Sequence, residues 1–341
     1  MNKKILIISA IILGIILATL AGLFLYLKPA KSDPILKPVK ILFVGDLMLD
    51  RYVADLDRRK GIGYFFDKII QSDKNFFSGY DLVSANLEGA VTNNGEHYSP
   101  VNGNDFAFLP ENVSSLKKYN FNFFNIANNH LYDQGEKGYQ ETKQNLDSLK
   151  FDYSGCPDRM VGDCSVKILN ISEKKIGMVG ASMVYGVFDT EKLKKQIQDL
   201  KSKTDFIVVN IHWGAEYAHN YNKVQQKTAH ELIDAGADII VGHHPHVVQG
   251  VEIYKNHPIF YSLGNFIFDQ YFSSDTQEGL SLGMNYSSEK LEINLYPLKS
   301  KNSQVVLMNE KEKTDFFEQM LKWSPDLVLT NWIKDGKLVI Y

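Results

Sequence analysis

The chain has 341 residues, enough to bury the core of one large domain or two small ones. Its formal net charge is only −3, which excludes a broad basic surface, so we expect no nucleic-acid partner. The proportions of hydrophobic and charged residues, 44% and 23%, are ordinary for a folded α/β protein.

The N-terminal segment differs from the rest of the chain because residues 5–27 carry no charge. Roughly 20 apolar residues span the hydrocarbon core of a bilayer. The apolar region of a cleaved signal peptide is shorter, about 7–15 residues, and precedes a small-residue cleavage site. The length predicts a transmembrane signal-anchor helix, and a cleaved signal peptide is the alternative, since "ATLAG" offers small residues.

The residues that flank this segment predict its orientation. Residues 1–4 contain two lysines and predict a short cytoplasmic N-terminus, because positive charge favours the cytoplasmic side. Residues 28–39 contain proline and lysine and predict a tether to the following domain. The expected location is the cell membrane, with a single pass and the main domain outside the cytoplasm.

The chain has two cysteines, Cys156 and Cys164, eight positions apart in "GCPDRMVGDC". A local disulfide is plausible outside the cytoplasm. Two free thiols in a loop are the alternative, because the sequence does not fix the geometry that a disulfide needs.

From residue 39 onward, short apolar runs alternate with amphipathic stretches, a pattern typical of a βα sheet buried on both faces. The predicted strands cover residues 39–45, 80–86, 121–127, 174–181, 205–211, 237–242 and 258–264. The predicted helices cover residues 109–119, 135–150, 189–202 and 222–236, the last ending at Gly236. Later segments predict antiparallel strands over 279–287, 290–300 and 304–310, followed by a helix over 313–323.

Compact polar clusters follow six of the apolar runs. In open α/β sheets, ligands bind beyond the carboxyl ends of the strands, so we expect these clusters to converge on one site. The clusters comprise Asp46; Asn86 and Glu88; Asn128, Asn129, His130 and Asp133; His212 and Glu216; His243, His244 and His246; and Asn265 and Asp269.

The converging residue types are those that bind zinc, manganese or iron through oxygen and imidazole donors. His244 and His246 would lie on the same side of extended backbone, stiffened by Pro245, and His243 would point away. Each cluster also has a structural alternative. An aspartate after a strand is often a helix N-cap, and paired asparagines are often turn residues. Six such coincidences at successive strand ends would be unusual, which favours a shared metal site.

Six segments also resemble the signature blocks of the CapA/PgsA capsule-synthesis family, which is associated with poly-γ-glutamate production and export. They are "GDLMLDR" (45–51), "ANLEGAVT" (85–92), "IANNHLYDQG" (126–135), "HWGAEY" (212–217), "GHHPHVVQ" (242–249) and "YSLGNFIFDQ" (261–270). The family is distantly similar to calcineurin-like metallophosphoesterases. The resemblance implies an α/β sandwich of two packed mixed sheets flanked by helices. We expect a CapA-type domain over residues 40–300 and a strand and helix extension over 301–341.

The resemblance and the clusters together define the candidate site. The expected metal ligands are Asp46, Glu88, Asn129, His212, His244 and His246. The expected catalytic residues are His130, His212 and Glu216, although Glu216 is equally well a surface carboxylate at the start of the next helix. The expected substrate-binding residues are Arg51, Asn86, Asn265 and Asp269; for Arg51, the alternative is a structural ion pair with Asp50 or Asp55.

Two positions depart from the metallophosphoesterase pattern. Met48 stands where a histidine ligand is expected; a thioether is a poor ligand for hard divalent metals, so we interpret Met48 as a core residue. The second acidic block reads "NLE", so the longer Glu88 would have to reach the site. These departures predict that one of two metal positions is weakened, altered or lost.

The leading functional hypothesis is a membrane-anchored component of poly-γ-glutamate or related polymer synthesis or export. Its cleft would bind a divalent manganese, zinc or iron ion and act on a polyanionic polymer or a phosphorylated substrate. The expected partners are membrane synthase or export subunits, and the lipid bilayer through residues 5–27. A non-catalytic polymer-binding subunit and an envelope metallophosphodiesterase unrelated to capsule are the alternatives.

Overall fold

The computed structural model describes residues 3–26, 37–101, 103–324 and 329–341. It divides into two units, Met1–Lys37 and Pro38–Tyr341. The described part of the first unit contains a single helix, α1 (Lys3–Tyr26). Within the described part of the chain, no helix has both the length and the apolar character that a membrane crossing requires. The anchor predicted over residues 5–27 is therefore not confirmed, and its last residue and most of the predicted tether lie outside the described residues.

The second unit is built on two large mixed sheets. The nine-stranded sheet has the order β16-β15-β14-β1-β2-β5-β6, with β13 paired to β1 and β17 paired to β15. Its strands are β1 (Val39–Leu47), β2 (Leu82–Leu87), β5 (Phe121–Asn125), β6 (Asp152–Ser154), β13 (Asn265–Ile267), β14 (Glu278–Tyr286), β15 (Leu291–Lys301), β16 (Gln304–Leu307) and β17 (Lys337–Ile340). Strands β1, β2, β5, β6 and β13 run parallel, and the others add antiparallel neighbours.

The six-stranded sheet has the order β11-β12-β10-β9-β8-β7. Its strands are β7 (Val166–Ile171), β8 (Lys174–Ser182), β9 (Phe206–His212), β10 (Ile239–His243), β11 (Val251–Tyr254) and β12 (His257–Phe260). The four central strands run parallel, and β7 and β11 are antiparallel edges. A small pair, β3 (Ala90–Val91) and β4 (Ala107–Phe108), lies outside both sheets.

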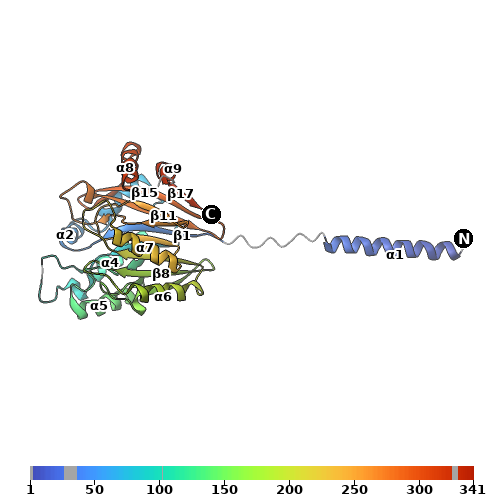
Figure 1. Ribbon diagram of the computed structural model, residues 1–341, viewed down its shortest axis with the longest axis horizontal. Coiled ribbons are helices and arrows are strands. Elements are labelled where there is room, and N and C mark those ends of the chain that lie inside the picture. The colour runs from blue at the N-terminus through green and yellow to red at the C-terminus, as the bar shows by residue number, and fades with distance from the viewer. Residues whose placement is uncertain (1–2, 27–36, 102, 325–328) are drawn as a thin grey trace. The chain divides into compact units, whose positions relative to one another are not determined.

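The helices of this unit are α2 (Arg51–Lys60), α3 (Gly63–Ser72), α4 (Pro110–Ser115), α5 (Gly135–Ser148), α6 (Thr190–Lys201), α7 (Lys223–Ala235), α8 (Glu310–Trp323) and α9 (Leu329–Lys334). Helices α2 to α5 bury their apolar faces on the nine-stranded sheet, and α6 and α7 bury theirs on the six-stranded sheet. In Figure 1, α5 and α6 lie on the side of this unit opposite to α8 and α9.

The two sheets pack face to face because β1 and its neighbours alternate their side chains between two cores. Val39, Ile41 and Phe43 join a cluster shared by both sheets, whereas Leu42 and Val44 join the cluster under α2 to α5. The α/β architecture of two packed mixed sheets flanked by helices is confirmed.

The segment after residue 300 continues the same compact unit. Strand β15 runs through residue 300, and β17 pairs with it along Leu291–Asn294. Phe316 and Met320 of α8 and Ile333 of α9 are buried in the cluster between the sheets. Cys156 and Cys164 form a disulfide, with Cα atoms 5.2 Å apart, in the loop between β6 and β7.

Candidate metal centre

Polar residues stand in matched register at or next to the last residues of β1, β2 and β5 and at the first residue of β13. In the nine-stranded sheet, Asp46 is paired with Asn86 on one side and with Asn265 on the other, and Asn86 is paired with Asn125. In the six-stranded sheet, the last residue of β9, His212, is paired with the last residue of β10, His243. The site therefore forms where the strand ends of two facing sheets meet, rather than along one sheet.

Two glycines allow the backbone of a later segment to close over these strand ends. A Cβ atom on Gly45 would lie 2.0 Å from the carbonyl oxygen of Gly264, and one on Gly242 would lie 2.0 Å from that of Tyr261. The close approach lets the backbone N–H of Asp46 donate to Gly264 over 3.0 Å. Any larger side chain at either glycine would push apart the strands that position Asp46 and His243.

Four non-glycine residues around the site have positive φ: Arg51 (50°), Tyr217 (64°), His244 (95°) and His246 (58°). Such backbone costs roughly 1–3 kcal/mol per residue and persists where the surroundings enforce it, often at functional sites. The extended geometry predicted for residues 244–246 is wrong, because β10 ends at His243 and the chain then turns. The prediction that His243 points away is also wrong, because its Nδ1 lies 3.3 Å from Asp46 Oδ1.

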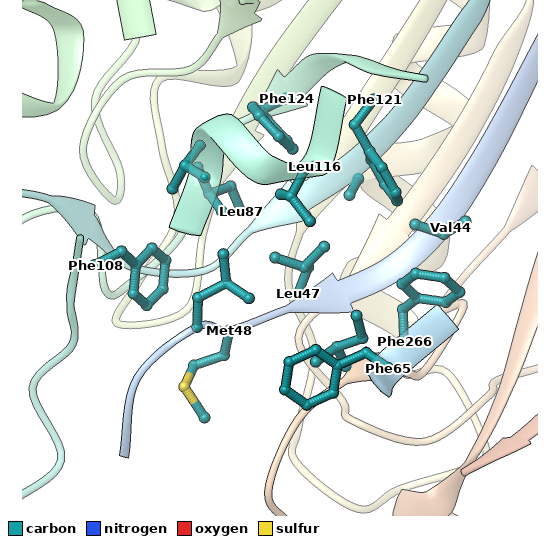
Figure 2. Packing of buried hydrophobic residues seen from close by; sticks show 14 of the residues in the cluster. Val44, Leu47, Met48, Phe65, Leu87, Phe108, Leu116, Phe121, Phe124 and Phe266 are labelled. Carbon is teal, nitrogen blue, oxygen red and sulfur yellow. The ribbon is translucent and has the colours of Figure 1, made fainter. Parts of the chain in front are cut away.

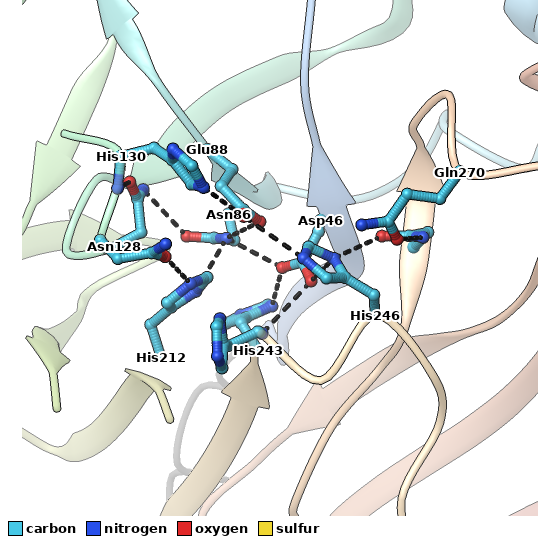
Figure 3. Close-up of polar contacts among 12 residues, drawn as sticks. Asp46, Asn86, Glu88, Asn128, His130, His212, His243, His246 and Gln270 are labelled. Carbon is cyan, nitrogen blue, oxygen red and sulfur yellow. Dashed lines mark hydrogen bonds and ion pairs between the residues drawn. The ribbon is translucent and has the colours of Figure 1, made fainter. Parts of the chain in front are cut away.

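The buried side chains of Asp46, Glu88 and His212, the inner donor set, offer ligand atoms that lie within 4.8 Å of one another. The Asn86 amide lies among them, as Figure 3 shows. Its Nδ2 is 2.8 Å from Asp46 Oδ1, 3.2 Å from His212 Nδ1 and 3.4 Å from Glu88 Oε2. The inner donor set is therefore held together by an amide of the chain itself.

Glu216, His244 and His246, the outer donor set, also offer ligand atoms within 4.8 Å of one another. His244 and His246 are buried and Glu216 is exposed. His244 Nδ1 and the nearby Glu88 Oε1 are buried without a hydrogen-bond partner, and Glu88 Oε1 lies 3.7 Å from His246 Nε2. Buried polar atoms of this kind are costly unless a ligand satisfies them, so the outer donor set fits a divalent cation.

Burial and the neighbouring charges shift the ionisation of both donor sets. Burial raises the pKa of Glu88 well above its ordinary value and lowers the pKa of His212 well below its own. Burial, with a contribution from His246, lowers the pKa of His244 to about 3. His212 and His244 are therefore neutral near pH 7, and the neutral imidazole is the form that binds metal.

The pKa values of Asp46 and His246 shift in the directions that favour an ion pair between the two side chains. Burial opposes the charged form of each, but their partners outweigh it. His243 and His246 hold the pKa of Asp46 well below its ordinary value. Glu88 and Asp46 raise the pKa of His246 to about 9, so His246 is a cation in the metal-free protein.

His130 and Asn129 lie between the donor sets and solvent. His130 Nδ1 is 2.7 Å from Asp133 Oδ2, and its Nε2 is 3.8 Å from Glu88 Oε1. Asn129 Oδ1 accepts from His212 Nε2 at 2.8 Å, while its amide group contacts the hydroxyl of Tyr185. Asp133 thus fixes the orientation of the His130 ring, and Asn129 fixes the tautomer of His212.

A cleft of about 550 Å³ opens above the outer donor set. Arg51 lies on its wall, paired with Asp269, and its guanidinium lies 4.8 Å from the centre of the Phe106 ring. The predicted alternative partners of Arg51, Asp50 and Asp55, are not the partner observed. An always-charged guanidinium at the cleft suits an anionic group of a substrate.

The structure brings the other predicted residues to the same region. Asn265 Oδ1 is 3.0 Å from His246 Nδ1, and Asp269 lines the cleft. Glu216 lines the cleft within the loop that precedes α7, seven residues before the helix begins, so it does not stand at a helix start. The interpretation of Met48 as a core residue agrees with its burial in the apolar cluster under α2 to α5 (Figure 2).

Sequence reasoning missed three residues of the site. Asn125 donates to Asn86 Oδ1 at 2.9 Å, and its position as the last residue of β5 was an available signal. Tyr185 and Tyr217 line the cleft from loops after β8 and β9. The block "HWGAEY" (212–217) was an available signal for Tyr217, whereas the sequence around Tyr185 carries no distinguishing pattern.

The comparisons with known proteins agree with the motifs. The family described as "Bacterial capsule synthesis protein PGA_cap" matches residues 40–270. The PGA biosynthesis protein CapA of Bacillus subtilis (strain 168) is 37% identical over 242 residues, covering 67% of this chain and 63% of that protein. The capsule biosynthesis protein CapA of Bacillus anthracis is 35% identical over 246 residues, covering 67% of this chain and 59% of that protein. The chain thus spans less than two thirds of the length of either relative.

Solved structures give more distant similarities. A hypothetical protein from Thermus thermophilus has a TM-score of 0.48 at 16% identity, covering 79% of this chain and 96% of that one. A putative 5'-nucleotidase from Staphylococcus aureus has a TM-score of 0.44 at 14% identity, covering 83% of this chain and 58% of that one. At these TM-scores neither structure bears on the function. The family match over residues 40–270 carries the assignment, and the chain belongs to the bacterial capsule synthesis protein family PGA_cap.

Proposed function

We propose that this protein acts in the synthesis or export of a poly-γ-glutamate capsule polymer, with a divalent cation bound in the cleft. The observation that carries the proposal is the cleft itself, where the outer donor set and Arg51 face the same space of about 550 Å³. The names of the Bacillus relatives, a PGA biosynthesis protein and a capsule biosynthesis protein, supply the pathway. A polyglutamate chain offers a carboxylate to Arg51 beside the oxygen of an amide linkage near the cation.

The residues of the outer donor set, with Glu88, would hold the cation, which can be manganese, zinc or iron. A bound cation supplies Lewis-acid stabilisation of charge on a carbonyl or phosphoryl oxygen. The chain supplies the rest. Arg51 binds the anionic group, and His130, oriented by Asp133, holds a proton at Nε2 for a leaving group or accepts one from a nucleophile. This arrangement supports hydrolysis of, or transfer to, the polymer or a phosphorylated precursor.

A polymer-binding subunit without turnover is the second candidate, and a specific observation favours it. Asn86 fills the inner donor set and Met48 lies in the core, so groups that would hold a second cation are missing from these two described positions. Both candidates share the proposed cell-membrane location and the proposed membrane synthase or export partners.

Complementation separates the two candidates. A strain that lacks this chain and its surface polymer would receive either the wild-type gene or the His246→Ala variant, and surface polymer would be measured. We expect the wild type to restore the polymer and His246→Ala to reduce it at least tenfold, because the variant loses a metal ligand. Full restoration by a folded, metal-free His246→Ala would contradict the catalytic proposal and favour the subunit.

In vitro binding tests the role of Arg51. Full-length wild type and Arg51→Ala would be titrated with poly-γ-glutamate in calorimetry, and we expect about tenfold weaker binding for the variant, as for one lost charge-assisted contact. Arg58→Ala, on the exposed part of α2, is the matched control and should bind as the wild type does. Equal affinities of the three proteins would remove the anion-binding role.

A further inference from the structure

The hydrogen bonds of the Asn86 amide set the number of cations that the site accepts. Asn86 is completely buried, and its Nδ2 contacts all three members of the inner donor set at 2.8–3.4 Å. Two carboxylates and an imidazole nitrogen are the ligands that a divalent cation would take. Here the positive end of an amide dipole lies among them.

The orientation of this amide is fixed by a chain of contacts that ends on the backbone. Asn128 Nδ2 donates to the carbonyl of Leu87 at 2.9 Å, and Asn128 Oδ1 accepts from the N–H of His130 at 3.1 Å. These backbone groups allow only one orientation of Asn128, whose Nδ2 therefore faces Asn86 Oδ1 at 3.4 Å. Asn125 donates to the same oxygen at 2.9 Å. A rotated Asn86 would set its NH₂ group against two other NH₂ groups, so its Nδ2 must face the inner donor set.

The outer donor set has no such internal donor among the described residues. His244 Nδ1 and Glu88 Oε1 remain buried without hydrogen-bond partners, as described above. The two donor sets are therefore unequal: the Asn86 amide contacts every member of the inner one, whereas His244 Nδ1 of the outer one, and the Glu88 oxygen that lies 3.7 Å from His246 Nε2, require a ligand.

We propose that the Asn86 side-chain amide takes the place of a cation in the inner donor set, so that the protein binds a single divalent ion, at the outer donor set. This inference rests on the metal site of the proposed function and adds its stoichiometry and the residue that limits it. An aspartate at position 86 would turn the amide donor into a ligand, and the inner donor set would then have three carboxylates and one imidazole. Asn86→Asp should therefore create a second cation position.

The experiment measures manganese bound to the full-length protein after loading and desalting, by elemental analysis and electron paramagnetic resonance. We expect about one ion per chain in the wild type, with an uncoupled Mn²⁺ spectrum, and about two in Asn86→Asp, with a spin-coupled spectrum from neighbouring ions. Asn122→Asp is the matched control. It adds the same charge near the start of β5, where the Asn122 side chain bonds to the backbone of Val83 and Asp81 and to neither donor set, and it should keep about one ion.

Each outcome supports or overturns a defined statement. Two ions with a coupled spectrum in the wild type would overturn the inference, and so would a folded Asn86→Asp that binds one ion. A wild type that binds no manganese, zinc or iron would contradict the metal site of the proposed function. Circular dichroism reports whether Asn86→Asp is folded. If it is not, the wild-type stoichiometry and spectrum decide alone.

Discussion

The inner and outer donor sets use the same residue types but differ in how their polar atoms are satisfied. The inner donor set is closed by Asn86, and all three of its members are fully buried. The outer donor set opens on the cleft through the exposed Glu216 and keeps a buried nitrogen without a partner. A group of carboxylates and imidazoles is therefore not a metal site until its hydrogen bonds have been counted, because an amide can stabilise the same group without an ion.

The largest effect should come from removing His246, which belongs to the outer donor set but also pairs with the buried Asp46, at 3.5 Å from His246 Nδ1 to Asp46 Oδ2. In the metal-free protein, His246→Ala leaves the Asp46 carboxylate without this cationic partner. We expect the free energy of unfolding to fall by about 3–5 kcal/mol, as when a buried ion pair is broken. Urea denaturation in the presence of a chelator measures this change.

His244→Ala tests the same donor set by removing a neutral ligand in place of the charged His246. The His244 ring is neutral, with a pKa of about 3, and its Nδ1 has no partner, so its removal leaves no charge unpaired. We expect metal binding to be lost as in His246→Ala, while the metal-free protein loses only about 1 kcal/mol. Equal destabilisation by the two substitutions would show that the ion pair of His246 with Asp46 does not stabilise the metal-free protein.

The next effect concerns the missing histidine of the metallophosphoesterase pattern. Met48 is completely buried in the apolar cluster (Figure 2). Its sulfur accepts from the N–H of Asp50 at 3.0 Å. Met48→His should therefore bury an imidazole without restoring a ligand, and lower the free energy of unfolding by about 2–4 kcal/mol. Thermal unfolding would measure the loss of stability, and elemental analysis would measure the number of bound ions. A stable variant with an additional ion would show that the side chain can turn toward the donor sets.

The sequence predicted the strands of the site and most of its residues because these depend on local patterns. The apolar runs that lead to Asp46, Asn86, His212 and His243 correspond to β1, β2, β9 and β10. It did not predict the backbone of residues 244–246, because the positive φ values are imposed by packing between two sheets. It could not predict the role of Asn86 either, because the direction of its amide depends on Asn128, which is itself oriented by the backbone of Leu87 at the end of β2 and of His130.

Metal affinity should depend on pH through His246. Its pKa of about 9 lies above the ordinary value of 6.5, so the metal-free protein keeps this proton at neutral pH, whereas a metal ligand must be neutral. Binding therefore releases a proton, and affinity should rise about tenfold per pH unit between about pH 7 and 9. Calorimetry in buffers of different ionisation enthalpy measures both the number of protons released and the metal affinity. An affinity that is constant over this range would contradict the charged state of His246.

The stability of the metal-free protein should change in the opposite direction over the same range. A raised folded-state pKa stabilises the protein fully below the ordinary value of 6.5, and this stabilisation is lost as the pH rises toward 9. Glu88, whose pKa is also raised, adds a loss of the same sign that begins at lower pH. His246→Ala removes the His246 contribution and serves as the control.

The smallest effect should come from Asp158, which lies in the disulfide loop and makes no hydrogen bond to either donor set. Its carboxylate accepts from the N–H groups of Val184 and Tyr185 at 2.9 and 3.1 Å, and so positions Tyr185 at the cleft beside Asn129. Asp158→Asn would set an amide N–H against one of these N–H groups. We expect about threefold weaker binding of poly-γ-glutamate, the cost of part of one hydrogen bond, with unchanged metal content.

The exposed Asp163→Asn in the same loop is the control. Because the outer donor set opens on the cleft and the inner one does not, a change in metal content with Asp158→Asn would show that the rim and the donor sets are coupled, and equal polymer binding by both variants would remove Tyr185 from the binding surface.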